Sequence, residues 1–154
     1  MTYFDLDGVI RDLTGTVFPP MEFKDWATPI YGQDLISYFD ERLHLLVEAP
    51  PTEYAPIIFK VKDLHIITSQ PQQWQENTTK WITSWRPDAK IIFASKKLHL
   101  LKDKDMIVED YPKFDNYSQV VLIDHLYNRC VERPLIRITH PDQLEEFLEE
   151  RGMI

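Results

Sequence analysis

Two aspartates separated by one residue stand near the start of the chain, in the stretch "YFDLDGVIRD". If the apolar residues before them form a strand, Asp5 and Asp7 point to the same side, because alternate strand side chains share a face. Two carboxylates so close repel each other unless positive charge holds them. A carboxylate can attack phosphorus, and a second one can exchange a proton with the leaving oxygen. The pair is therefore a candidate for phosphoryl chemistry, the alternative being an acidic turn in water.

Other polar residues follow apolar runs later in the chain. They are Thr68-Ser69 after "LHII", Ser95-Lys96-Lys97 after "AKIIFA" and Glu109-Asp110 after "MIV". In an open parallel sheet, ligands bind beyond the carboxyl ends of the strands, so these side chains are expected at one edge. Carboxylate oxygens suit Mg²⁺, and a lysine and a hydroxyl can hold a transferring phosphoryl group.

The elements that must position these residues are short β-rich runs. The expected strands cover residues 64–68, 89–95, 106–110, 120–124 and 135–139. They lack polar alternation, as strands covered on both faces do. Residues 72–85, between the first two of these runs, have helical spacing, and a strand–helix–strand unit favours a parallel sheet and the α/β class. A final helix is expected from Pro141. The link between 95 and 106 is short for a crossover helix, so a helical turn or a loop is expected there.

The stretch from 13 to 56 breaks this rhythm. It holds six of the eleven prolines and many aromatic residues, with one amphipathic helix expected over 32–46. We interpret residues 1–12 and 57–154 as the α/β core domain, and residues 13–56, the inserted segment, as a small helical cap. A long peripheral excursion that packs its own aromatic side chains is the open alternative.

The composition excludes several classes of protein. A chain of 154 residues with 44% hydrophobic and 27% charged residues is ordinary for a soluble domain. The net charge of −8 argues against a grip on polynucleotide phosphates. The apolar runs are too short for a bilayer span, and the single cysteine, Cys130, excludes an internal disulfide. A cytoplasmic location without membrane partners is expected; the oligomeric state stays open, a homodimer among the alternatives.

Four motifs carry a resemblance to a known family. "FDLDGVIRD" resembles the first motif of the haloacid dehalogenase-like (HAD) phosphohydrolases, and "IITS", "SKK" and "DMIVEDYP" resemble the second, third and fourth, in family order along essentially the whole chain. The resemblance implies a Rossmann-like three-layer α/β/α core with a cap inserted after the first strand. It also implies a Mg²⁺-dependent phosphatase that works through an aspartyl-phosphate. The late "LIDHLYNR" is similar to the tail of the 5'(3')-deoxyribonucleotidase group.

The resemblance implies a role for each matching residue. Asp5 matches the nucleophile and a metal ligand, Asp7 the general acid/base whose backbone carbonyl also meets the metal, Thr68 the phosphate-binding hydroxyl with Ser69 beside it, Lys97 the motif lysine with Lys96 as the alternative, and Asp110 a metal ligand. Glu109 departs from the Asp-Asp pair usual in the deoxyribonucleotidase group. Other branches of the superfamily have Glu-Asp, so metal binding by Glu109 and Asp110 is still expected.

The expected substrate is a (deoxy)ribonucleoside monophosphate. Phe18, Trp26 and Tyr31 are candidates to stack on the base, since they are nearest the first strand in sequence; packing within the cap is the competing role for each. Another small phosphomonoester, a nucleic-acid 3'-phosphate end, or a non-catalytic protein that binds phosphorylated ligands are the alternatives.

Overall fold

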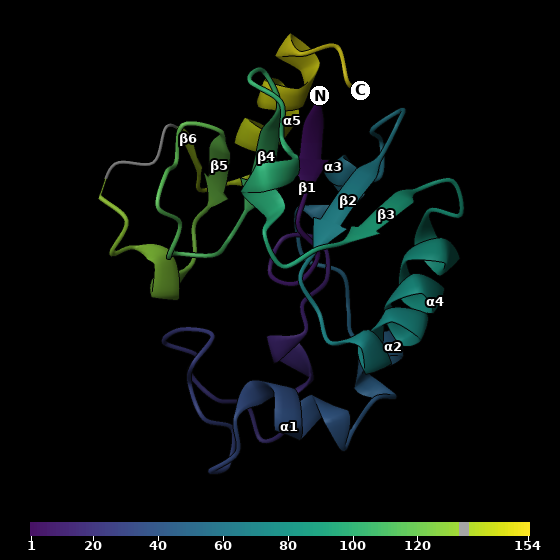
Figure 1. The fold of residues 1–154 in the computed structure, drawn as a ribbon, viewed down its shortest axis with the longest axis vertical. Coiled ribbons are helices and arrows are strands. Elements are labelled where there is room, and N and C mark those ends of the chain that lie inside the picture. The colour runs from purple at the N-terminus through teal and green to yellow at the C-terminus, as the bar shows by residue number, and fades with distance from the viewer. Residues whose placement is uncertain (133–135) are drawn as a thin grey trace.

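A single parallel sheet organises the chain (Figure 1). The computed structural model describes residues 1–132 and 136–154, and in this part six strands pair in the order β3-β2-β1-β4-β5-β6. The strands are β1 (Thr2–Phe4), β2 (His65–Thr68), β3 (Lys90–Phe93), β4 (Met106–Glu109), β5 (Val120–Ile123) and β6 (Ile136–Ile138). The α/β class and the expected strands are confirmed. The expected start of the last strand at Leu135 lies outside the described residues.

The order of the strands reverses at β1. From β1 the chain moves outward to β2 and β3, then returns to pair β4 with the other side of β1. Phe4 lies opposite Val108, and the Asp5 amide donates to the Val108 carbonyl at 2.8 Å. The residues that follow β1 and β4 therefore lie side by side at the reversal point, where open parallel sheets form a crevice.

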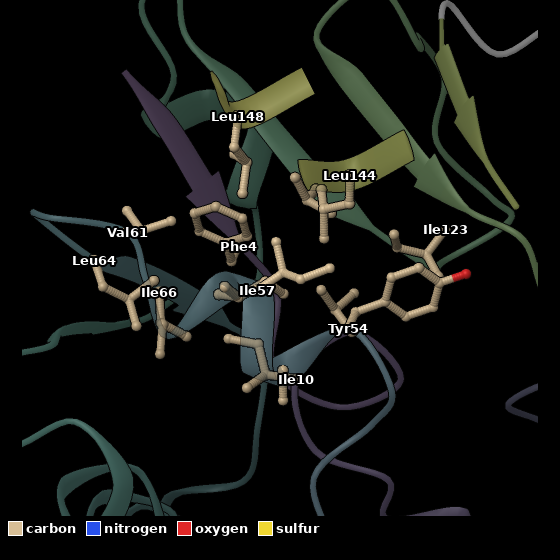
Figure 2. Packing of buried hydrophobic residues seen from close by; sticks show 14 of the residues in the cluster. Phe4, Ile10, Tyr54, Ile57, Val61, Leu64, Ile66, Ile123, Leu144 and Leu148 are labelled. Atoms are coloured by element: carbon tan, nitrogen blue, oxygen red, sulfur yellow. The ribbon is translucent and has the colours of Figure 1, made fainter. Parts of the chain in front are cut away.

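The α-helices beside the sheet share one of its faces. They are α3 (Ala55–Ile58), α4 (Gln75–Trp85, preceded by the 3₁₀ helix η2, Gln72–Trp74) and α5 (Pro141–Glu150). Figure 2 shows Phe4 of β1 in the same cluster as Ile57 of α3 and Leu148 of α5. Burying each such side chain stabilises the fold by about 1.5–3 kcal/mol. None of the helices in the described part of the chain is long and apolar enough to cross a membrane.

The opposite face of the sheet is covered differently. Ile67, Ile107 and Leu122 lie on it, since they alternate with residues of the first face. They pack against the 3₁₀ helix η3 (Lys97–Leu100) and connecting loops, and no α-helix of the described residues contributes to this cluster. The second α-helical layer of the expected three-layer α/β/α core is therefore not seen among the described residues, where the short connections 94–105 and 110–119 form η3 and loops instead. Of the two alternatives expected between 95 and 106, a helical turn or a loop, the structure has the helical turn, η3.

The inserted segment lies beyond the carboxyl ends of the strands, below the sheet in Figure 1. Its elements are the 3₁₀ helix η1 (Thr14–Thr16), α1 (Leu35–Asp40) and α2 (Leu45–Glu48). A separate hydrophobic cluster runs from Leu13 to Ala49 and includes Trp74 of η2. Tyr54 and Ala55 pack in the core of the sheet instead, so the segment's own packing stops before the expected boundary at 56.

The helix expected over 32–46 is divided into α1 and α2. The Arg42 guanidinium donates to the Tyr38 carbonyl at 3.0 Å, and the Arg42 amide donates to Phe39. In a continuous helix the Tyr38 carbonyl would accept from the Arg42 amide. The side chain thus replaces a helical hydrogen bond, and the chain turns at this point.

Candidate active site

Four charged side chains meet at the reversal point between β1 and β4; we call them the charged floor. They are Asp5, Lys97, Glu109 and Asp110, all buried. Asp5 directly follows β1, Asp110 directly follows β4, and Lys97 begins η3. The Lys97 Nζ lies 2.6 Å from Asp5 Oδ1 and 2.6 Å from Glu109 Oε1. The convergence expected from the strand ends is therefore present.

The charged floor has more negative than positive charge. Three carboxylates face one ammonium, which would leave two negative charges unbalanced if all were ionised. Burial and the nearby Glu109 raise the pKa of Asp5 to about 7, and burial and Asp5 raise the pKa of Asp110 to about 7. Burial would lower the pKa of Lys97, but Asp5 and Glu109 outweigh it and raise that pKa. Burial is the first cause of the raised carboxyl pKa values and repulsion between the carboxylates the second, which the single ammonium of Lys97 does not offset.

The residues present fit a divalent cation. Asp5, Glu109 and Asp110 each offer an oxygen, and these oxygens lie within 4.8 Å of one another. Asp5 Oδ1 is buried without a hydrogen-bond partner in the described part of the chain, its contact with Lys97 lacking hydrogen-bond alignment. An all-oxygen set of this kind suits Mg²⁺, which would balance the two excess charges.

Glu109 differs from the two aspartates in its contacts. Its Oε1 accepts from Lys97, while its Oε2 accepts from the amides of Asp110 at 3.1 Å and Tyr111 at 3.2 Å. Both oxygens are thus already hydrogen-bonded by the protein. Asp5 and Asp110 are better placed as cation ligands, and Glu109 primarily holds Lys97.

Asp7 lies in a second network at the cavity wall. Arg11, which is fully buried, donates from Nε to Asp7 Oδ1 at 2.6 Å and from Nη2 to Oδ2 at 2.9 Å. Gln70 donates to the same Oδ2 at 2.7 Å and accepts from Thr78, whose hydroxyl also contacts Arg11 at 3.3 Å. This closed ring fixes the orientation of Asp7. The side chain of Asp7 is outside the acidic group, and contact of its backbone carbonyl with a cation stays a prediction.

Gly8 allows the floor to close. Its φ of +85° is a conformation that favours glycine, and a Cβ here would lie 2.3 Å from Asp110 Oδ2. A side chain at this position would displace Asp110, so the glycine of "DLDG" serves both the turn and the close approach of the two loops.

A cavity of about 480 Å³ opens above the charged floor. Its wall includes Thr68, Ser69 and Trp26, as expected for substrate-binding residues. We call its border on the inserted segment the rim, formed by Trp26, Asp34, Leu35 and Ile36. The aromatic side chains of Trp74, Tyr111 and Phe114 also line the cavity.

Three expected binding residues are not among those that line the cavity. Phe18 is 83% exposed, Tyr31 is 51% exposed and donates its hydroxyl to the Pro19 carbonyl, and Lys96 is exposed. Phe18 and Tyr31 lie in irregular stretches of the inserted segment. In such stretches, nearness in sequence to β1 does not determine whether a side chain points into the cavity. Lys97, rather than its neighbour Lys96, faces the carboxylates, since Lys97 is the buried residue of η3 and Lys96 is exposed.

Sequence reasoning missed Arg11, Gln70 and Tyr127 as members of the site. Arg11 had a usable signal: it is a cation that follows the apolar Val9 and Ile10, four positions after Asp7. Tyr127 was singled out only through the family tail, and its hydroxyl donates to Asp110 Oδ2 at 2.5 Å. Gln70 had no distinguishing signal.

No protein-family model matches the chain, and no curated protein sequence matches it.

Proposed function

We propose that the chain is a Mg²⁺-dependent phosphomonoesterase of the HAD type, with the inserted segment as its cap. The observation that carries the proposal is the buried set of Asp5, Lys97 and Asp110 at the β1–β4 reversal, beneath a cavity with Thr68 in its wall. Mg²⁺ would be held by Asp5 and Asp110, and when bound it would neutralise charge on the phosphoryl oxygens.

The chain's own residues divide the chemistry. The Asp5 carboxylate attacks phosphorus and takes the phosphoryl group, while the leaving oxygen takes a proton from Asp7. Water then attacks the aspartyl-phosphate, giving its proton to Asp7, and phosphate leaves with Asp5 regenerated. Lys97 and the Thr68 hydroxyl hold the phosphoryl oxygens.

The geometry of Asp7 adds a requirement to the first step. Both of its oxygens accept hydrogen bonds from Arg11, and Oδ2 also accepts from Gln70. Carrying a proton on either oxygen requires that oxygen to leave its present donor. The same release is required in the second step, when an oxygen of Asp7 accepts the proton from water.

We propose a nucleoside monophosphate as substrate. The volume of about 480 Å³ is in the range of small-ligand pockets, and Trp26, Trp74 and Phe114 offer aromatic surface to a base. Lys97 is the one basic side chain among the described residues that line the cavity, which suits a single phosphate.

The test is phosphate release from a panel of ribo- and deoxyribonucleotides, sugar phosphates and 3'-phosphorylated oligonucleotides, with and without Mg²⁺. We expect Mg²⁺-dependent release from nucleotides and a loss of roughly 10³-fold or more in Asp5→Asn. Activity on oligonucleotides alone would change the substrate, and full activity in Asp5→Asn would refute the mechanism. No release from any substrate would favour a non-catalytic ligand-binding protein.

A further inference from the structure

One oxygen of Asp110 is held by two donors from distant parts of the chain. The Trp26 indole N–H donates to Asp110 Oδ2 at 2.9 Å, and the Tyr127 hydroxyl donates to the same atom at 2.5 Å. Trp26 belongs to the inserted segment, and Tyr127 to the 3₁₀ helix η4 (Leu126–Asn128) after β5. Two donors at one oxygen fix the rotation of the carboxylate.

The other oxygen of Asp110 receives no hydrogen bond from the residues that the structure describes. Asp110 offers an oxygen to the acidic group of Asp5 and Glu109, within 4.8 Å of theirs. Because an indole N–H can only donate, Trp26 cannot itself be a cation ligand; it holds Oδ2 and leaves the other oxygen of Asp110 without a hydrogen bond. Oδ1 is thus the oxygen of Asp110 that none of the described residues holds by a hydrogen bond, and a cation would take it.

Tyr127 is itself firmly supported. Its ring stacks on His125 with centroids 4.9 Å apart, and the His125 Nε2 lies 2.7 Å from the Gly8 carbonyl oxygen. Asn128, fully buried, donates to the carbonyls of Asp110 at 2.9 Å and Ile123 at 2.6 Å. Tyr127 and Asn128 are thus anchored to both loops of the charged floor, the one after β1 and the one after β4.

Trp26 has a different kind of support. Its ring meets Tyr127 edge-on, with centroids 5.9 Å apart, and it is half-buried. It lines the main cavity and also a second cavity of about 380 Å³, which Gly8, His125 and Tyr127 line as well. The Trp26 side chain therefore contributes to both cavities, and Asp110 is its one hydrogen-bond partner in the described part of the chain.

We propose that Trp26 and Tyr127 are positioning residues that set the affinity for Mg²⁺ by orienting Asp110. The proposal rests on the cation site of the proposed function and adds to it a link between the inserted segment and that site. Residues that hydrogen-bond to a metal ligand typically change metal affinity by about 10–100-fold when the bond is removed. Trp26 thus acts on the cation, in addition to any contact with a base.

The test measures Mg²⁺ affinity directly, by calorimetry and by the dependence of the unfolding temperature on Mg²⁺ concentration. Trp26→Phe keeps an aromatic ring and removes the N–H; Tyr127→Phe removes one hydroxyl. We expect each to weaken Mg²⁺ binding by about 10–100-fold. Raising the Mg²⁺ concentration should then restore most of the lost phosphate release.

Matched controls are available in the same chain. Trp85 is 48% exposed on α4 and stacks on Phe59, and Tyr31 donates only to the Pro19 carbonyl. Trp85→Phe and Tyr31→Phe should bind Mg²⁺ as the wild type does. A cooperative unfolding transition, measured without Mg²⁺, shows whether each variant is folded.

The outcomes separate this proposal from the proposed function. Unchanged Mg²⁺ affinity in both Trp26→Phe and Tyr127→Phe would overturn the positioning role, even in an active phosphatase. Weakened affinity in these variants, in a protein that releases no phosphate from any substrate, would support the positioning role and refute the phosphatase. A wild type that binds no Mg²⁺ would overturn the positioning role and the magnesium site together.

Discussion

The charged floor and the rim of the cavity are built in different ways. Asp5 and Asp110 of the floor directly follow strands at the centre of the sheet and are buried. The rim comes from the inserted segment, where α1 has six residues and Ile36 is 47% exposed. The floor is thus held by the sheet, whereas the rim depends on a smaller cluster around Leu13 and Phe39. If the chain has the proposed activity, the floor would carry the chemistry and the rim the selectivity, and Trp26 of the rim donates to Asp110 of the floor.

The largest expected effect on stability concerns Arg11 beneath the cavity. Arg11→Met removes the cation from Asp7 and leaves the Leu46 carbonyl, which Arg11 Nη1 reaches at 2.8 Å, without that donor. Breaking a buried pair in this way costs about 3–5 kcal/mol, which urea unfolding would measure. The control in the inserted segment is Arg42→Met, since Arg42 is 37% exposed and lies over the Tyr38 ring. The free energy of unfolding of Arg42→Met should fall by less than about 1 kcal/mol. Equal falls in the two variants would contradict the difference between the floor and the inserted segment.

Two glycines with similar positive φ angles allow the floor and the inserted segment to be compared. Gly8 and Gly32 have φ of +85° and +80°, but a Cβ at Gly32 meets nothing within 4 Å. In Gly32→Ala, the free energy of unfolding should therefore fall by only about 1 kcal/mol, because of backbone strain. In Gly8→Ala it should fall by roughly a further 1–3 kcal/mol, because the new Cβ crowds Asp110. Gly8→Ala should also lose Mg²⁺ binding. Calorimetry and urea unfolding check both, and a Gly8→Ala protein with intact Mg²⁺ affinity would show that the floor is less closely packed than described.

The smallest expected effect is at the rim. Ile36 lines the cavity and is 47% exposed, so Ile36→Ala should raise KM for a nucleotide by a few-fold and leave kcat near the wild-type value. Val47→Ala on α2 is the control, because Val47 is 42% exposed and is not among the residues that line the cavity. Steady-state kinetics would decide, and a fall in kcat without a change in KM would place Ile36 with the floor instead.

Residues at strand ends were predictable, and residues in loops were not. Asp5 and Asp110 follow strands whose apolar runs are plain in the sequence, and parallel pairing brings such ends together whatever the loops do. Phe18 and Tyr31 were expected at the cavity because they are near β1 in sequence. Their backbone is irregular, so this nearness does not determine where their side chains point. The contact of Arg11 with Thr78 spans 67 residues, and no local pattern encodes a partner at that distance.

The expected helix over 32–46 shows the same limit. Its apolar spacing is helical, but the Arg42 side chain takes the Tyr38 carbonyl and the helix divides. Competition between a side chain and the backbone for one acceptor depends on three-dimensional neighbours, which spacing alone does not report.

The most direct test of the central claim is to look for the phosphoryl group on Asp5. Turnover of a nucleoside monophosphate with Mg²⁺ is quenched with acid within a few milliseconds, and the N-terminal peptide is examined by mass spectrometry. We predict one phosphoryl group on Asp5 in the wild type and none in Asp5→Asn. Rapid phosphate release with no phosphoryl group on Asp5 at any quench time would contradict the account.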